Sequence, residues 1–301
     1  MAKKKGAAYM TEEGAPLKKR SYIGEIWHNL KKNKLSMVCL VIILIMLFCI
    51  IFADVISPYD YAEQDLTARF QLPSLAHPFG TDDYGRDLLT RLMVGGRYTL
   101  LIAILSVAIG IIFGMIVGAI AGYFGGWIDN VLMRIMDIIM SIPGMMLAIV
   151  ISTALGSGVF NTALALAVGT IPMIARQLRS STMSIHGQEY IEAAKSFGES
   201  DFKIIITHVV PNCLAPIIVQ TTLYLGSSIM AIAGLSFLGL GVQPPTPEWG
   251  NILNTGLDYI YDFSTRWNMI VFPALVIVIA ELCFNLLGDG LRDAMDPRMH
   301  K

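Results

Sequence analysis

The stretch SMVCLVIILIMLFCIIFADVI, Ser36 to Ile56, is apolar throughout except for the hydroxyl of Ser36 and the carboxylate of Asp54. About 20 consecutive apolar residues are enough for a helix to cross the hydrocarbon core of a bilayer. The polar, basic segment before it is longer than the basic region of a signal peptide, and no A-x-A-like cleavage site follows. The stretch is therefore predicted to be a transmembrane helix that the protein keeps.

The rest of the chain repeats this apolar pattern. Of its 301 residues, 54% are hydrophobic and 15% are charged, whereas soluble domains carry about 25% charged residues. Five further runs are long enough to cross a bilayer: 98–123, 130–155, 159–178, 211–235 and 268–288. The predicted fold class is an all-α polytopic membrane protein with six transmembrane helices. Pro143 and Pro172 are expected to kink the third and fourth spans, because proline removes a backbone donor.

Lysine and arginine are distributed unequally between the two sides of these spans. Of the 22 such residues, 17 fall on one side and five on the other. Because segments rich in Lys and Arg stay in the cytoplasm, both termini are predicted to be cytoplasmic and residues 57–97 extracytoplasmic. Nine of the 17 precede the first span: Lys3, Lys4, Lys5, Lys18, Lys19, Arg20, Lys31, Lys32 and Lys34.

Cysteine and histidine give no indication of a metal or catalytic site. The five histidines are scattered, and the cysteines lie in or beside apolar runs without C-x-x-C spacing. The net charge of −1 comes from segregated charges and predicts no nucleic-acid partner. No G-x-x-x-x-G-K-[ST] phosphate-binding loop occurs, so the chain is not expected to bind ATP by that device.

Glycines in the second span indicate a close helix contact. Gly110, Gly114, Gly118 and Gly122 recur at every fourth position after Ser106. Such a stripe lets another helix approach closely within a membrane. The approaching helix belongs either to this chain or to a second subunit, and the sequence leaves both open.

Charged residues inside the spans are costly and therefore informative. Arg134 and Asp137 are three residues apart in the third span and are expected to pair. Glu281 lies within the last span and is expected to face protein, water or a partner, with lining of a pore as one possibility.

A polar segment that could not cross lipid separates the fourth and fifth spans: EYIEAAKSFGESDFKIIITHVVPN, Glu189 to Asn212. Residues 188–197 are predicted to form a short helix with an apolar face of Tyr190, Ile191, Ala194 and Phe197. Gly198 is expected to end it in the left-handed conformation. Ser200 or Asp201 then caps a second helix, which runs into the fifth span near Pro211.

The spacing of this segment carries a family resemblance. Glu192-Ala193-Ala194 is followed after three residues by Gly198 and later by Pro211, in a predicted cytoplasmic loop before the penultimate span. This pattern resembles the EAA loop of ABC importer permeases, although the usual ending I-x-L-P is His208-Val209-Val210-Pro211 here. HPFGTDDYGRDLLTRLMVGGRYTL (77–100), FLGLGVQPPTPEWG (237–250) and FNLLGDGLRDAMDPR (284–298) resemble permeases for dipeptides, oligopeptides and nickel.

The chain is thus identified as a C-type permease, the second membrane component of such an importer in a prokaryotic cell membrane. The resemblance implies three kinds of partner besides lipid: a second homologous permease, two ATP-binding subunits that hold ATP and Mg, and an extracytoplasmic substrate-binding protein. This chain would bind no cofactor and form half of a pore for di- or oligopeptides. ATP-driven closure of the ATPases would push the coupling helix and switch access from outside to inside.

The resemblance also implies which residues meet the partners. Those expected to dock on an ATP-binding subunit are Glu189, Tyr190, Glu192, Ala193, Ala194, Lys195, Phe197 and Gly198. Those expected to face the binding protein are Asp82, Asp83, Arg86, Asp87, Gln243 and Trp249. The predicted organisation is a basic segment (1–35), a first helix (36–56), an extracytoplasmic segment (57–97), a five-helix core (98–288) containing the coupling loop (180–210), and a tail (289–301).

Several alternatives stay open. Permeases for nickel, metal chelates or glutathione share the same motifs, so the substrate is undetermined. The helix over 188–197 could instead lie on the membrane without a partner. A secondary transporter should show charged or unwound midplane sites on inverted repeats, and the sequence has no clear repeat. A membrane enzyme would need convergent nucleophile and base pairs, whereas the acidic clusters lie in loops.

Overall fold

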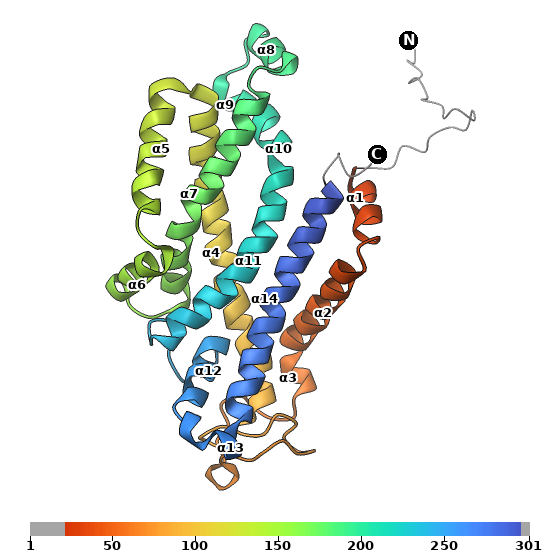
Figure 1. Ribbon diagram of the computed structural model, residues 1–301, viewed down its shortest axis with the longest axis vertical. Helices are drawn as coiled ribbons and strands as arrows, with labels where there is room; N and C mark the ends of the chain where they lie inside the picture. Colours follow the sequence, from red (N-terminus) through yellow and green to blue (C-terminus); the bar gives the residue numbers. More distant parts are fainter. Residues whose placement is uncertain (1–21, 296–301) are drawn as a thin grey trace, which may run out of the picture.

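The fold is a bundle of long helices that run along one axis (Figure 1). A computed structural model describes residues 22–295, so the basic segment up to Arg20 and the end of the tail lie outside the description. No strand occurs within 22–295. The helices are α1 (Tyr22–Leu30), α2 (Lys34–Ile51), α3 (Ala53–Ile56), α4 (Leu88–Phe124), α5 (Gly126–Met140), α6 (Gly144–Leu155), α7 (Val159–Ile185), α8 (Glu189–Ser196), α9 (Asp201–Ile204), α10 (Val210–Asn212), α11 (Leu214–Phe237), α12 (Trp249–Leu257), α13 (Phe263–Arg266) and α14 (Asn268–Met295), with 3-10 turns at Leu66–Ala68 and Ile260–Asp262 and a π-helical turn at Ile205–Val209.

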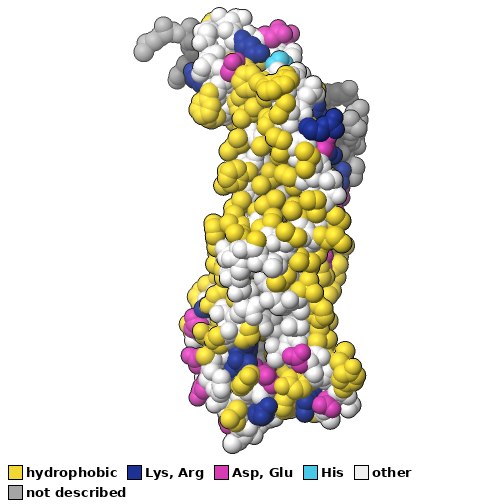
Figure 2. Space-filling model, turned by 90° about the vertical axis from the view of Figure 1, so that its left-hand side faces the viewer, with side chains coloured by type: hydrophobic (Ala, Val, Ile, Leu, Met, Phe, Trp, Pro, Cys, Tyr) yellow, Lys and Arg dark blue, Asp and Glu magenta, His cyan; other side chains and the backbone are white. Residues whose placement is uncertain are grey.

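Five of these helices, α2, α4, α7, α11 and α14, are long and apolar enough to cross a membrane. The pair α5 and α6 is apolar enough to count as a sixth span if the two are taken together. Figure 2 shows charged side chains gathered at the two ends of the molecule and a largely hydrophobic surface between them. This distribution matches a bundle that spans a bilayer, as the sequence predicted.

The third predicted span is broken rather than kinked. α5 ends at Met140, and α6 begins after Pro143, whose backbone is extended (φ −53°, ψ 128°). The axes of α5 and α6 differ by 85°. Pro172, by contrast, lies inside the continuous helix α7. The two prolines therefore have different effects. The helix has already ended before Pro143, whereas it continues through Pro172.

The glycine stripe packs within this chain. α4 lies along α7, and a Cβ atom added to Gly114 would lie 2.9 Å from the carbonyl oxygen of Ile171. At Gly122 the added atom would lie 2.8 Å from the carbonyl oxygen of Arg179. Because real Cβ atoms do not come this close to a backbone, α7 can approach α4 this closely at these positions only because they are glycine. Of the two alternatives, contact inside the subunit is confirmed.

α4 begins ten residues before the predicted start of the second span. It has 37 residues and is therefore about 55 Å long, which exceeds the roughly 30 Å hydrocarbon core. Its first turns hold Arg97, which lies 2.9 Å from the carboxylate of Asp54 and donates to the carbonyl oxygen of Ile50. In the sequence, the charge of Arg97 indicated a loop. In the structure, the Arg97 side chain joins α4 to the end of α2.

The two ends of the bundle differ. α8 lies at the end that also holds α1 and the C-terminal turns of α14, and the loop before α4 lies at the opposite end (Figure 1). α14 packs between α11 on one side and α1 and α2 on the other. The predicted cytoplasmic and outer segments therefore fall at opposite ends, as a membrane-spanning arrangement requires.

Candidate functional site

α8 presents one face to its own chain and one to the outside. Ile191 is completely buried (0% exposed), and it packs with Leu178 and Ile204 in one apolar cluster. Tyr190 is exposed, and Phe197 is 87% exposed. The apolar face predicted from the sequence is thus divided, because only Ile191 and Ala194 point inward. The two aromatic side chains extend outward and are free to contact another molecule.

The predicted docking residues lie on the outer face of α8 with one exception. Glu189, Glu192, Ala193, Lys195 and Gly198 are exposed, together with the two aromatic residues. Ala194 is buried in the same cluster as Ile191. The structure therefore corrects the expectation for Ala194, whose methyl group packs against its own chain. The reason is the helical spacing, since a residue three positions after Ile191 lies on the same face.

Gly198 ends α8 in the conformation that was predicted. Its φ is +78°, and the amides of Gly198 and Glu199 donate to the carbonyl oxygens of Lys195 and Ala194 at 3.0 and 3.1 Å. This pair of bonds is a glycine-type helix C-cap. Nothing lies within 4 Å of a Cβ atom added there, so the requirement for glycine comes from the backbone alone. We call residues 189–204, which turn at Gly198, the elbow.

Tyr123, at the end of α4, holds both halves of the elbow. Its hydroxyl donates to the carboxylate of Asp201 at 2.6 Å, on the far side of Gly198. The ammonium group of Lys195, on the near side, lies 4.9 Å from the centre of the Tyr123 ring. Tyr123 is buried, and its ring also meets that of His186 edge-on. Tyr123 therefore connects both halves of the elbow directly to the long helix α4. No sequence motif marks this tyrosine.

Glu199 stabilises the second half of the elbow. Its carboxylate accepts from the ammonium group of Lys203 at 2.9 Å and lies 3.1 Å from Nε2 of His208. The hydrogen bond from Lys203, followed by that from His208, lowers the pKa of Glu199 below its ordinary value. The carboxylate therefore remains ionised at neutral pH and ties α9 to the turn that follows.

The connection from the elbow to α11 is irregular. A π-helical turn over Ile205–Val209 precedes Pro211, which supplies no backbone donor. The side-chain amide of Asn212 donates to the carbonyl oxygen of His208 at 2.6 Å and satisfies a group that a regular helix would pair with a backbone N–H. Such wide turns often occur at functional positions of helices. The segment that joins the elbow to α11 is therefore not a regular α-helix.

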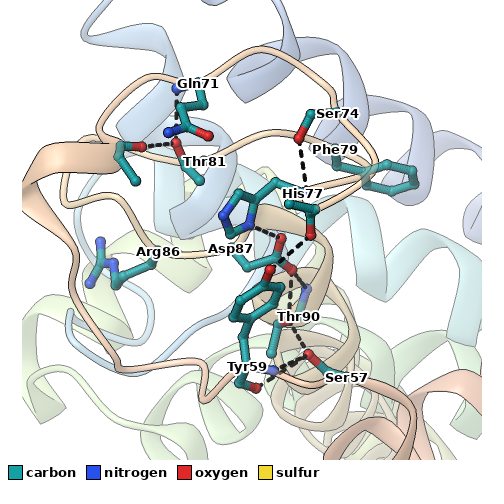
Figure 3. A network of polar contacts seen from close by, with 12 residues as sticks. Ser57, Tyr59, Gln71, Ser74, His77, Phe79, Thr81, Arg86, Asp87 and Thr90 are labelled. Atoms are coloured by element: carbon teal, nitrogen blue, oxygen red, sulfur yellow. Dashed lines mark hydrogen bonds and ion pairs between the residues drawn. The ribbon is translucent and has the colours of Figure 1, made fainter.

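At the opposite end, the loop before α4 is held by internal polar contacts (Figure 3). Asp87 caps α4 by accepting from the backbone amide and the hydroxyl of Thr90 at 2.8 and 2.6 Å. The other oxygen of Asp87 lies 2.9 Å from Nδ1 of His77, whose ring stacks on Tyr59. One carboxylate therefore connects the helix start to two distant points of the loop.

A second group of charges in this loop is also internal. Arg86 donates to Asp82 at 2.7 Å, and Arg91 approaches the same carboxylate at 3.3 Å. Asp82, Arg86 and Asp87 are all buried, so their side chains do not face outward as expected for contacts with a binding protein. Asp83 is half-buried, and burial and then the neighbouring charge of Asp82 raise its pKa.

Gln243 and Trp249 differ in their surroundings. Gln243 is exposed, in agreement with the expected outward orientation. Trp249 is 1% exposed, and its indole N–H donates to the carbonyl oxygen of Leu92 at 2.8 Å. The structure corrects the expectation for Trp249, because the indole ring belongs to the core between α12 and α4. Gln243 and the half-buried Asp83 are the members of the predicted outer set that remain accessible.

Two protein families match different parts of this chain. Residues 110–301 match the family described as "Binding-protein-dependent transport system inner membrane component". Residues 21–76 match the "N-terminal TM domain of oligopeptide transport permease C". The first match covers more than half of the chain. This protein belongs to the family of binding-protein-dependent transport system inner membrane components.

The chain is also similar to individual transport system permease proteins over nearly their whole length. The chain is 44% identical over 275 residues to the dipeptide transport system permease protein DppC of Alkalihalophilus pseudofirmus, covering 91% of this chain and 90% of that protein. It is 45% identical to DppC of Escherichia coli strain K12 (91% and 93% covered). It is 44% identical to the glutathione transport system permease protein GsiD of Shigella flexneri serotype 5b (91% and 90% covered).

A solved structure supports the fold. The methionine ABC transporter MetNI, in an inward-facing conformation, contains a chain that aligns with a TM-score of 0.50 and 20% sequence identity. The alignment covers 67% of this inner membrane component and 96% of that chain. At this identity the likeness concerns the fold alone, and it agrees with the predicted ABC importer permease architecture.

Glu248 is a buried carboxylate of this inner membrane component that sequence reasoning missed. It is 0% exposed and caps α12 by accepting from the amides of Gly250 and Asn251 at 2.9 and 3.0 Å. It also accepts from the hydroxyls of Thr99 at 2.9 Å and Ser236 at 2.7 Å. One side chain therefore joins α4, α11 and α12. The only signal in the sequence was a carboxylate directly after Pro247 and before an apolar helix.

The charged residues of the spans pair differently from the sequence expectation. Asp137 contacts Arg176 of α7 rather than Arg134, and Asp129 accepts from Arg179 of α7 at 2.6 Å. Helix α5 is thus attached to α7 by two ion pairs, because the packing of separate helices brings these groups closer than the spacing along α5. Glu281 is half-buried in α14, and its carboxylate forms no hydrogen bond or ion pair with another residue of 22–295.

Proposed function

We propose that this chain is the permease subunit of an ATP-driven importer for short peptides and that α8 is its coupling helix. The observation that carries the proposal is the divided surface of α8: an inner face buried against its own chain and an outer face with Tyr190, Ala193 and Phe197 exposed. An exposed aromatic surface on a fixed helix is suited to docking into a groove of another protein. The family to which the chain belongs supports an importer with separate energising and substrate-binding partners.

The proposed mechanism uses the contacts of the elbow. ATP and Mg would be held by two ATP-binding subunits, which lie on the cytoplasmic side together with both termini. Closure of these subunits would displace α8, and the contacts of Tyr123 with Asp201 and Lys195 would carry the displacement to α4. Together with a second homologous permease, the spans would then open the pore to the cytoplasm. An extracytoplasmic binding protein would deliver the substrate at the opposite end, near Gln243 and Asp83.

The substrate class rests on the relatives. DppC proteins are named for dipeptides and GsiD for glutathione, and the identities of this chain to the two kinds are nearly equal. Both substrates are short peptides with free carboxylates, so a pore that accepts peptide backbone would serve either. We favour di- or oligopeptides and treat glutathione, nickel and metal chelates as alternatives. The decisive assay is uptake of a labelled dipeptide by the assembled importer, with competition by unlabelled glutathione or a nickel salt.

Two neighbouring substitutions test the role of α8. Ala193→Glu places a charge on the exposed outer face, whereas Ala194→Glu places one in the buried cluster. We expect Ala193→Glu to assemble with the second permease and to lose ATPase binding or coupled uptake. Ala194→Glu should instead reduce the amount of folded protein, because an unpaired buried charge is costly. Uptake at the wild-type rate by Ala193→Glu, with the ATPase attached, would contradict the proposal.

Glu281 is proposed to line the pore. Its carboxylate lies within a span and is half-buried without a partner among the described residues, and charge at this depth is tolerated toward protein or water. Glu281→Gln should leave assembly intact and change the rate of uptake. If Glu281→Leu assembles and transports like the wild type, the residue has no role in the pore.

A further inference from the structure

Three exposed lysines and an exposed tryptophan lie close together in the sequence where the first span begins. Lys31 and Lys32 lie between α1 and α2, Lys34 is the first residue of α2, and all three are exposed. Trp27 is 44% exposed, and the ammonium group of Lys31 lies 5.1 Å from the centre of its ring. No ion pair to a residue of 22–295 neutralises these lysines. Three cationic groups are therefore available to a ligand, and that of Lys31 lies next to an exposed aromatic ring.

The lysines are held in place by the fold. α1 packs on α14 through buried Leu30, which belongs to a cluster with Cys39 and Leu287. Asn33 caps α2 by accepting from the amide of Ser36 at 3.2 Å, and the Ser36 hydroxyl donates to Leu286 at 3.1 Å. The turn therefore has a fixed position relative to the bundle, so its lysines form a surface rather than a flexible chain.

This surface lies at the boundary of the apolar zone. Leu35 and Val38, which directly follow the lysines, are more than half exposed, as expected for side chains that face lipid tails. Tryptophan is enriched at the headgroup level of membranes, where one part of the ring is apolar and the other is wet. The three lysines are thus at the depth of lipid headgroups, and not far out in the aqueous phase.

The charge of this region fits an anion. The neighbouring charged groups on α1 and α14 are Glu25, Asp289, Arg292 and Asp293, so the described charges there sum to about +1. Clusters of Lys and Arg directly on the cytoplasmic side of a span attract anionic lipids. We infer that Trp27 and the Lys31–Lys34 turn form a binding surface for the headgroups of anionic phospholipids.

A second tryptophan supplies a control within the same chain. Trp127 begins α5, which starts at the end of the bundle that holds α1 (Figure 1), and it is 77% exposed. The nearest charge along α5 is Asp129, which is paired with Arg179. Trp127 therefore shares the exposure and the end of the molecule with Trp27, but within residues 22–295 no lysine lies over its ring as Lys31 does over Trp27. Any preference for anionic lipid that comes from the lysines should be confined to Trp27.

The test uses photocrosslinking in the assembled importer, reconstituted in vesicles of equal parts phosphatidylglycerol and phosphatidylcholine. Trp27→p-benzoylphenylalanine and, separately, Trp127→p-benzoylphenylalanine are irradiated, and the attached molecules are identified by mass spectrometry. A lysine near an anionic surface strengthens binding about fivefold. We expect adducts at position 27 to be enriched in phosphatidylglycerol by about fivefold or more, and adducts at position 127 to reflect the bulk mixture.

Two further variants separate charge from folding. The triple change Lys31→Gln, Lys32→Gln and Lys34→Gln should abolish the enrichment at position 27, and the corresponding change to Arg should retain it. With the three lysines unchanged, a higher salt concentration should also reduce the enrichment at position 27, because salt screens the interactions of exposed charges. Equal adduct composition at positions 27 and 127 overturns the inference. Crosslinking of position 27 to another subunit instead of lipid also overturns it. Neither result bears on the role of α8.

Discussion

Replacement of Gly198 tests whether the shape of the elbow matters for coupling. The residue has φ +78° and nothing within 4 Å of an added Cβ atom, so a side chain meets backbone strain without a steric clash. An L-residue in the left-handed conformation costs about 1–2 kcal/mol, and a β-branched residue is a stronger outlier. Gly198→Val should therefore be more harmful than Gly198→Ala.

The size of this cost is comparable to what holds the turn. The two capping hydrogen bonds, from the amides of Gly198 and Glu199, contribute about 1 kcal/mol each. A loss of 1–2 kcal/mol changes a two-state population by about 5–30-fold. If only the turned elbow binds the ATPase, the apparent affinity is proportional to the fraction of molecules in which the elbow keeps its turn. We expect a decrease of up to about 30-fold for Gly198→Ala and a larger one for Gly198→Val.

Gly187 provides the matched control. It lies just before α8, has no positive φ, and also has nothing within 4 Å of an added Cβ atom. Gly187→Val should change the affinity little, since surface substitutions away from special features are usually within about 0.5 kcal/mol. The assay is titration of the purified permease complex with its ATP-binding subunits, followed by uptake at saturating ATPase. Equal behaviour of Gly187→Val and Gly198→Val would refute the reasoning.

Three further predictions concern the bundle and the elbow. Glu248→Ala should lower the thermal midpoint of the detergent-purified protein strongly, because four donors lose this acceptor and each buried donor left unsatisfied costs about 1–3 kcal/mol; an unchanged midpoint contradicts this. Gly118→Leu should prevent α4 from packing on Ala175 and reduce the yield of folded protein, whereas Gly169→Leu, in open space, should not. The pKa of Glu199 is lowered in the folded elbow, so its contribution to stability is complete above the ordinary value of 4.5 and is lost as the pH falls through the lower folded value. Proteolysis of the elbow should therefore not increase as the pH falls from neutrality to about pH 5, and an increase over that range contradicts the assignment.

The features that the sequence predicted correctly depend on local information. The apolar runs require only length and composition, and the spacing of four glycines is enough to indicate a close helix contact. Gly198 follows a short helix directly, and its positive φ can be inferred from its place in the chain. The family resemblance rested on the same local pattern, with Gly198 and Pro211 at fixed distances from Glu192.

The features that the sequence did not give depend on contacts between distant segments. Asp82 and Arg86 form part of a charged loop in sequence, and only the fold decides that their charges face inward. One of the two hydroxyls that donate to Glu248 comes from Thr99, 149 residues away. The direction of Ala194 depends on which side of α8 meets α7 and α9. Pro143 predicts a disturbance of the helix, but the 85° angle depends on how α5 and α6 pack.

The central claim, that the outer face of α8 meets an ATP-binding subunit, is tested most directly by crosslinking. Three of the four native cysteines are buried, so they should give little background. Ala193→Cys, on the exposed face, should crosslink to an ATP-binding subunit of the assembled importer, and Ala194→Cys, in the buried cluster, should react far less. Gln243→Cys, at the opposite end, should react with a membrane-impermeant reagent added from outside. Labelling of Ala193→Cys by that external reagent, or its crosslinking to the substrate-binding protein, would contradict the account.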